Sequence, residues 1–421
     1  MGRRRAGGGD QTTYLETEPV RNLFQPEPRG VRAPRPTLRF AGPRVEVEKA
    51  HSDRSAGRCR PLVLFFDLVF ILTLLRLGQA LVDQLSWTGV LETLILLLAA
   101  FSIWTFTASV CDTFDPSRPV IELFIFGTMI GALVMAVAIP GAFGERGVLF
   151  AATYVALHIG RDLLLLVILR GHNAQAAVVQ GLLWFGASAV PWIVGAFTRG
   201  PVRPALWAFA ILLEYAIARL RFPVPRRGRI QPKDFPPAGE HLGERYRQLF
   251  TVALGEVFLA AGIAHGLGDF EAYSNVAFAV TFISTVLIWR IYIYRAGALL
   301  EAAVFRAYEP IRISRSVSRA HAIMVAGVLT VSVGGKLVIS HPVEHTRPAW
   351  ISVILGGPVL FLLGRVVLER AVGGRFHATR LVAVVVLAAL APVLLYLPPL
   401  VAASAAAAVL GGVTVTDTIR I

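Results

Sequence analysis

The chain has 421 residues, of which 55% are hydrophobic and only 16% are charged. A soluble protein of this length could not bury so much Leu and Val, so the composition excludes an ordinary soluble fold. The net charge of +14 is divided between the N-terminal segment and alternate loops, and does not form one basic patch with interleaved aromatic residues. We therefore expect the lipid bilayer, and no nucleic acid, as a partner.

The first 60 residues differ in composition from the rest of the chain. They are rich in Arg, Gly and Pro, as in GRRRAGGG and QPEPRGVRAPRP, and contain few large apolar residues. Such a segment cannot bury enough apolar surface to fold, so we expect residues 1–60 to be a disordered basic tail in the cytoplasm. Contact of this tail with anionic lipid is a further expected partnership, since each basic residue near the membrane surface contributes about 1 kcal/mol.

Twelve apolar stretches follow, each roughly the length of about 20 residues that a membrane-spanning helix needs. They lie at 62–82, 90–110, 119–139, 147–169, 174–197, 204–219, 248–267, 274–295, 319–340, 350–369, 378–396 and 398–416. The sixth is short and the last two are separated only by Leu397-Pro398-Pro399, so ten or eleven spans are the alternatives. We predict an all-α fold, a polytopic membrane helical bundle of about 12 transmembrane helices over residues 61–421.

The loops between the expected helices differ strongly in their Lys and Arg content. Most of the 41 basic residues lie in the tail, in the segment 220–247 and in every second loop. The opposite loops contain only Arg146, Arg199, Arg203 and Arg347. Cytoplasmic loops carry the excess of basic residues in membrane proteins. The sequence therefore predicts a multi-pass protein of the cell (plasma) membrane with both termini in the cytoplasm.

A proline-rich segment at 220–247 divides the expected helices into six and six. Its prolines make it a poor helix and a natural linker between halves at 61–219 and 248–421. The first helix of each half begins with Leu-Phe and then carries an acid, Asp67 in one half and Glu256 in the other. This weak similarity predicts two copies in the same orientation, an arrangement that places the binding site of some transporters between the halves.

Asp67 and Glu256 are the first candidates for a functional site, because an ionised acid inside a span is costly unless a partner or water relieves it. Asp67 is expected about one turn into its helix. It is either a carboxylate near the cytoplasmic interface, solvated or paired with Arg, or a proton or cation site desolvated by Phe65, Phe66 and Phe70. Glu256 lies about halfway along its span, where a function is the favoured interpretation.

A second group of polar residues lies on the helix at 147–169. Tyr154, His158 and Arg161 are spaced by four and three residues, which puts them on one face, with Asp162 beside them. They either line a polar cavity or form a packing group in which Arg161 and Asp162 neutralise each other or a neighbour. The sequence leaves both interpretations open.

Four further residues, Glu214, Trp289, Tyr292 and His321, belong to the candidate set. Glu214 lies well inside the short sixth helix, and Trp289 and Tyr292 belong to the aromatic cluster that ends the eighth. His321 lies near one end of the ninth helix, and Lys336 lies near its other end. We expect His321 among the lipid headgroups and Lys336 to extend toward the interface.

Several segments match, in the right order, a pattern known from one bacterial family. They are Leu64–Phe70, Ala138–Gly144, Phe150–Val155, Glu244–Arg245, Leu249–Thr251 and Leu254–Glu256, followed by Trp289, Tyr292, His321 and Gly327. Over about 60–420 the chain thus resembles the bacterial low temperature requirement protein A family. The resemblance implies a multi-pass inner-membrane protein, and the family name, which refers to a growth defect in the cold, gives a phenotype and not a reaction.

The chain departs from that family pattern at three positions next to the two acids. The acid that usually precedes LFFD is Val63, the Gln usually found nine residues after the Asp is Arg76, and the Ser common after the LGE acid is Val257. These changes remove polar groups near both acids and add a cation. We therefore include Arg76 among the candidate site residues.

Enzyme motifs are scarce in this sequence. It contains no P-loop, HExxH or CxxC, and the nearby prolines argue for a loop around His341 and His345. We expect no metal and no cofactor. Three functional classes remain: a transporter or channel for a small solute or ion with protons on Asp67 and Glu256, a membrane-embedded lipid-modifying enzyme, and a structural or regulatory membrane protein.

Overall fold

The computed structural model describes residues 56–225, 228–230, 242–268, 271–293, 310–373 and 378–419. Most of the tail expected over residues 1–60 lies outside the described residues, as does the central part of the linker expected over 220–247. Residues 56–60 belong to the first helix.

The described residues form twelve α-helices and one 3-10 turn, which confirms the expected all-α fold. The helices are α1 (Ala56–Asp83), α2 (Trp87–Thr113), α3 (Pro119–Ala138), α4 (Gly147–Ile168), α5 (Gln175–Phe197), α6 (Val202–Leu220), α7 (Leu242–Gly266), α8 (Ala272–Ile293), α10 (Pro310–Ser340), α11 (Pro348–Gly373), α12 (Ala378–Leu394) and α13 (Pro399–Ile419). The 3-10 turn, Ile139–Gly141, follows α3. Each of the twelve expected helices corresponds to one of these.

Ten of the described helices are long and apolar enough to cross a membrane. The remaining two are α12, which is apolar but has 17 residues, and α6, whose 19 residues include Arg203, Glu214 and Arg219. The chain is therefore a multi-pass membrane protein, whose described residues contain ten candidate spans and two further helices.

Three helices begin six to nine residues earlier than hydropathy predicts. They are α1, which begins at Ala56, α7, which begins at Leu242, and α10, which begins at Pro310. Each extension contains Arg residues, which lower the hydropathy of a segment but are good helix formers. As a result, Asp67 lies about three turns into α1 and not one.

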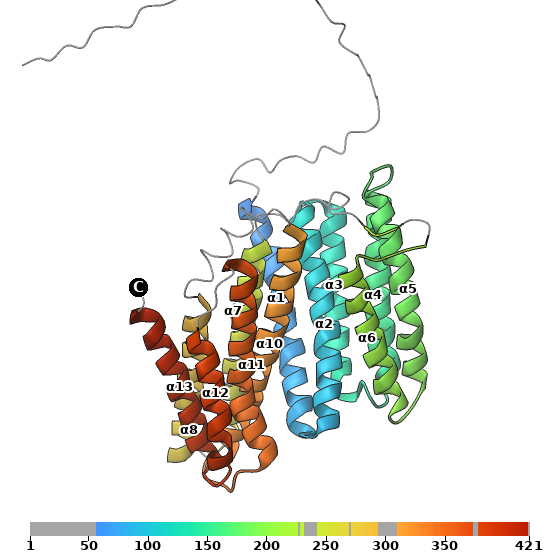
Figure 1. Cartoon of the computed structure of the whole chain (residues 1–421). Coiled ribbons are helices and arrows are strands. Elements are labelled where there is room, and N and C mark those ends of the chain that lie inside the picture. The colour runs from blue at the N-terminus through green and yellow to red at the C-terminus, as the bar shows by residue number, and fades with distance from the viewer. Residues whose placement is uncertain are drawn as a thin grey trace, which may run out of the picture. The chain divides into compact units, whose positions relative to one another are not determined.

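Within the compact unit His51–Ile421, the described helices fall into two successive groups. Corresponding helices of the two groups have corresponding neighbours. In the first group α1 packs against α2 and α3, the chain continues through α4 and α5 to α6, and α6 packs against α2. In the second group α7 packs against α8 and α10, the chain continues through α11 and α12 to α13, and α13 packs against α8. The groups, coloured blue to green and yellow to red in Figure 1, meet where α1 packs against α7 and α10.

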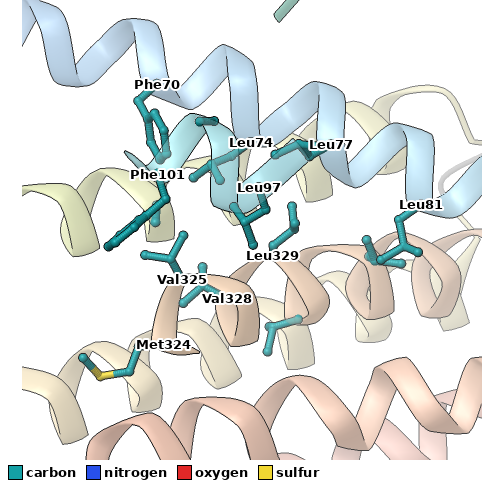
Figure 2. Close-up of a cluster of buried hydrophobic side chains, with 14 of the residues drawn as sticks. Phe70, Leu74, Leu77, Leu81, Leu97, Phe101, Met324, Val325, Val328 and Leu329 are labelled. Carbon is teal, nitrogen blue, oxygen red and sulfur yellow. The ribbon is translucent and has the colours of Figure 1, made fainter. Parts of the chain in front are cut away.

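An apolar layer fills the contact between α1, α2 and α10. Figure 2 shows Leu74 and Leu77 of α1, Leu97 of α2, and Val325 and Leu329 of α10 pointing toward one another. All five are buried. This layer closes the middle of the contact between the two groups of helices.

The pair α10 and α11 is packed at backbone distance. A Cβ atom added at Gly327 would lie 2.6 Å from the backbone nitrogen of Phe361, and one added at Gly357 would lie 2.7 Å from that of Val331. Small residues permit such close approach between membrane helices. α10 is therefore held against α11 while its opposite side faces α1 and α7.

Candidate functional site

Asp67 is fully buried between α1, α2 and α7. The indole Nε1 of Trp104 donates a hydrogen bond of 2.8 Å to Asp67 Oδ1, and Nη2 of Arg245 lies 3.6 Å from the same oxygen. Among the described residues, the other carboxylate oxygen has no hydrogen-bond partner. The carboxylate is therefore compensated by a cation, as one of the two sequence interpretations expected, but only one of its oxygens is used.

Arg245 is itself a buried and poorly bonded cation. It comes from the charged extension at the start of α7, and its guanidinium lies 5.8 Å from the centre of the Trp104 ring. Within the described part of the chain, none of its three side-chain nitrogens makes a hydrogen bond. The pair of Arg245 and Asp67 is thus held by charge and by Trp104, and not by a close bidentate contact.

Glu256, also fully buried, has a different environment. Ser332 Oγ of α10 donates a hydrogen bond of 2.9 Å to Glu256 Oε1, and the other carboxylate oxygen has no partner among the described residues. Lys336 lies one helical turn beyond Ser332 and is 9% exposed. Glu256 Oε1 and Lys336 Nζ lie 3.6 and 3.7 Å from the point that a Cβ of Gly78 would occupy, so both border a space that this glycine leaves open.

The two acids mark two levels of one contact, which we call the α1–α7–α10 seam. Asp67 and Gly78 are eleven residues apart on α1, and Arg245 and Glu256 are eleven residues apart on α7. Eleven residues of an α-helix rise about 16 Å. The Asp67 level and the Glu256 level are therefore well separated, and Phe70 and Leu74 of α1, which Figure 2 labels, lie between Asp67 and Gly78 along the helix.

Aromatic side chains surround the Asp67 level on the side of the second group of helices. The Tyr292 hydroxyl lies 3.0 Å from His321 Nε2, and the His321 ring lies 4.6 Å from the ring of Tyr246. Tyr246 in turn packs 5.2 Å from Trp104. His321 is fully buried, so the expectation that it lies among headgroups is wrong. The aromatic residues provide the partners and the enclosure that the sequence could not foresee.

Two candidate residues lie outside these contacts. Arg76 is exposed, because it is nine residues beyond Asp67 and a helix turns by about 100° per residue, which puts the two on opposite faces. Trp289 is 43% exposed, whereas Trp104, which donates to Asp67, is fully buried. Lys336, which we expected at the interface, is buried beside Glu256.

The remaining candidates meet in a separate place, the Glu214 cluster, made of Ser102, Tyr154, Ser188, Trp192 and Glu214. The carboxylate of Glu214 accepts hydrogen bonds from the Tyr154 hydroxyl at 2.5 Å, from Ser188 Oγ at 2.8 Å and from Trp192 Nε1 at 3.0 Å. Ser102 Oγ lies 3.0 Å from the Tyr154 hydroxyl. This acid is held by neutral donors that come from α4 and α5.

His158 and Arg161 extend this cluster along α4. Arg161 Nε donates to Asp162 Oδ1 at 2.8 Å, and its guanidinium lies 4.1 Å from the centre of the Phe106 ring. The His158 ring stacks on Phe185 at 4.5 Å. Arg161 and Asp162 therefore neutralise each other, as one interpretation predicted. The face of α4 that carries Tyr154, His158 and Arg161 is a packed polar group and not an open cavity.

Sequence reasoning missed several partners of the candidate acids. Arg245 was part of the family pattern, but nothing in its local sequence links it to Asp67, because the contact joins residues of α1 and α7. Ser332 and Lys336 could have been found from their spacing of four residues, which puts both on one face of α10. The four buried charges of Arg365, Glu369, Arg380 and Asp417, which connect α11, α12 and α13, were also missed.

The fold and these contacts define a multi-pass helical membrane protein with charged groups buried between its helices. The family model described as "Bacterial low temperature requirement A protein (LtrA)" matches residues 58–415, and the chain belongs to this family. It is 30% identical over 311 residues to the "Uncharacterized protein RA0937" of Rhizobium meliloti (strain 1021), an alignment that covers 73% of this chain and 76% of the relative. No solved structure matches the chain.

Proposed function

We propose that this protein is a transporter or channel for a small solute or ion, with Glu256 as the group that binds and releases a proton or cation. The proposal rests on one observation. Glu256 is completely buried, it has one carboxylate oxygen without a partner in the described part of the chain, and the space left by Gly78 lies beside it. Carboxylates in such positions inside membrane proteins commonly serve ion or proton pathways.

The arrangement of the helices supports placing this pathway between two halves. We propose that residues 61–219 and 248–421 are two copies of one unit, because the neighbours of each helix recur in the same order in both groups. Binding sites between repeats are common in transporters. Part of the apolar layer of Figure 2, including Leu74 and Val325, lies between the two acid levels, so passage along the seam requires the two halves to move apart there.

The two other classes make different demands on the site. A lipid-modifying enzyme needs its acids to act on one reacting group, whereas Asp67 and Glu256 lie on levels about 16 Å apart. A structural protein needs each acid to face a fixed cation. Asp67 with Arg245 satisfies that demand, and this observation makes a structural role the second candidate for the Asp67 level.

Proton and cation flux into liposomes containing the purified full chain tests the transport proposal. We expect flux above that of empty liposomes, and we expect Glu256→Gln to abolish it. Glu122→Gln is the matched control, because Glu122 is an exposed acid in the first turn of α3. Absence of flux from folded wild-type protein, over a range of pH and imposed potential, would contradict the proposal and leave the structural role.

The orientation of the protein is a separate part of the proposal. We propose that both termini lie in the cytoplasm and that the basic tail contacts anionic lipid of the plasma membrane, since basic residues concentrate in the tail and in alternate loops. Labelling of introduced cysteines in whole cells tests this orientation. Reagents that cannot cross the membrane should modify a cysteine at Arg347 and spare one at Arg118, after Cys59 and Cys111 have been replaced.

A further inference from the structure

A row of hydrogen bonds joins His158 to Glu214 in the first group of helices. His158 Nε2 lies 3.2 Å from Ser102 Oγ, Ser102 Oγ lies 3.0 Å from the Tyr154 hydroxyl, and that hydroxyl lies 2.5 Å from Glu214 Oε2. His158, Ser102 and Tyr154 are all buried. None of the four residues lies on α1, α7 or α10, so the row is separate from the seam.

Arg161 fixes the direction of this row. Its guanidinium can only donate, and Nη1 lies 3.4 Å from His158 Nδ1, so Nδ1 accepts and the neutral ring carries its proton on Nε2. That N–H donates to Ser102 Oγ. At the other end an ionised Glu214 can only accept, so Tyr154 donates to it and receives a hydrogen bond from Ser102. Each donor thus points toward Glu214.

Ser102 is the one link with a choice of acceptor. Its hydroxyl proton can point to the Tyr154 oxygen, which completes the row, or to the backbone carbonyl of Ala99 at 2.9 Å, which interrupts it. Rotation of one hydroxyl therefore opens or closes the connection. Such a rotation requires no movement of a helix.

The carboxylate of Glu214 is suited to receive a proton. Within the described residues it forms no ion pair, and its hydrogen bonds come from uncharged groups. By contrast, Asp417 in the second group of helices is paired with Arg380 at 2.9 Å. Arg161, a cation whose charge acts on Glu214, is already paired with Asp162 at 2.7 Å. Protonation of Glu214 thus breaks no ion pair among these residues.

Glu214 also borders a small pocket. Trp184, Phe185 and Phe222 line this pocket together with Glu214. The ring of Phe185 also stacks on His158 at 4.5 Å, so this pocket lies alongside the row.

We propose that His158, Ser102 and Tyr154 form a proton relay that ends at Glu214. In the forward step the Tyr154 proton moves to Glu214 Oε2, the Ser102 proton moves to Tyr154, and the His158 Nε2 proton moves to Ser102. His158 Nδ1 takes one proton from hydronium, for which Arg161 must give up its contact of 3.4 Å. The net change is one proton added to the Glu214 carboxylate, and the reverse sequence releases it.

Infrared difference spectroscopy of the full chain in lipid nanodiscs after a rapid drop in pH tests the relay. We expect the carbonyl stretch of a protonated carboxyl group to appear, and its loss in Glu214→Gln assigns it to Glu214. Ser102→Ala should slow the appearance of this band by about a hundredfold, the lower end of the effect of a positioned proton-transfer group. Ser102→Thr keeps the hydroxyl and should restore the rate.

Ser109→Ala is the matched control for this experiment. It also removes a hydroxyl from α2, but that hydroxyl is exposed and bonds the backbone carbonyl of Thr105, away from the row, so the rate should remain near that of the wild type. If Ser102→Ala does not fold, Tyr154→Phe can replace it. This variant removes the next link of the row and should also slow the appearance of the Glu214 band. The relay is refuted if folded wild-type protein shows no Glu214 band at any pH, or if both link variants match the wild-type rate. Absence of ion flux in the liposome experiment would contradict the transport function proposed for Glu256, but it would not contradict the relay.

Discussion

The two levels of the α1–α7–α10 seam each bury an acid near a cation, yet they are built differently. At the Asp67 level the cation is Arg245, the acid receives an indole hydrogen bond, and aromatic rings enclose the pair. At the Glu256 level the cation is Lys336, the donor is a serine, and Gly78 leaves space beside both charges. The first level is enclosed and charge-paired, and the second has room for the methyl group that Gly78 lacks.

The largest effect is expected at the Asp67 level. Arg245→Gln removes the cation and leaves Asp67 buried without compensation, which typically costs about 3–5 kcal/mol of stability. Thermal or denaturant unfolding in detergent measures the loss. The double variant Asp67→Asn with Arg245→Gln should recover much of it. Arg76→Gln, which changes an exposed Arg of the seam helix α1, should leave stability unchanged. If Arg245→Gln and Arg76→Gln changed the stability equally, this would contradict a fixed ion pair between Asp67 and Arg245.

A smaller loss of stability is expected at the Glu256 level. Lys336→Gln removes a buried cation that is attached to a flexible side chain and lies beside one carboxylate, so we expect about 1–2 kcal/mol by the same unfolding measurement. Its effect on ion flux should be larger than that of Arg245→Gln in the fraction of protein that remains folded. A stability loss as large as that of Arg245→Gln would show that both levels are structural.

The smallest effect on stability, together with a clear effect on function, is expected at Gly78. The added methyl group of Gly78→Ala meets neighbours at 3.4–3.7 Å, which is ordinary contact, and alanine favours a helix over glycine by about 1 kcal/mol. The variant should therefore be as stable as the wild type. Because the methyl group fills the space beside Glu256, liposome flux should fall.

Gly127→Ala is the matched control for this variant. A Cβ at Gly127 on α3 meets no atom within 4 Å, so both the stability and the flux of that variant should remain at wild-type values. Unchanged flux in Gly78→Ala would show that the space beside Glu256 is not part of the pathway. A loss of flux in both variants would show only that glycine-to-alanine changes in these helices are not tolerated.

Hydropathy and charge predicted most of the architecture, because a membrane helix must satisfy its own backbone and hide its polar groups. All twelve helices were expected, and the largest errors lie at the N-terminal ends of α1, α7 and α10, where Arg-containing turns continue the helix. These ends matter for the site, since Arg245 lies on one of them. A hydropathy window rejects such residues although they favour the helix.

The sequence by itself determined which acids lie inside apolar helices, because composition along one helix is a local property. Only the tertiary structure decided what each acid meets. Arg245 reaches Asp67 across a contact between α1 and α7, Lys336 lies beside Glu256 and not at an interface, and Glu214 is held by donors from α4 and α5. These contacts join residues distant in the chain, and they depend on the rotation and depth of each helix, which packing against its neighbours sets.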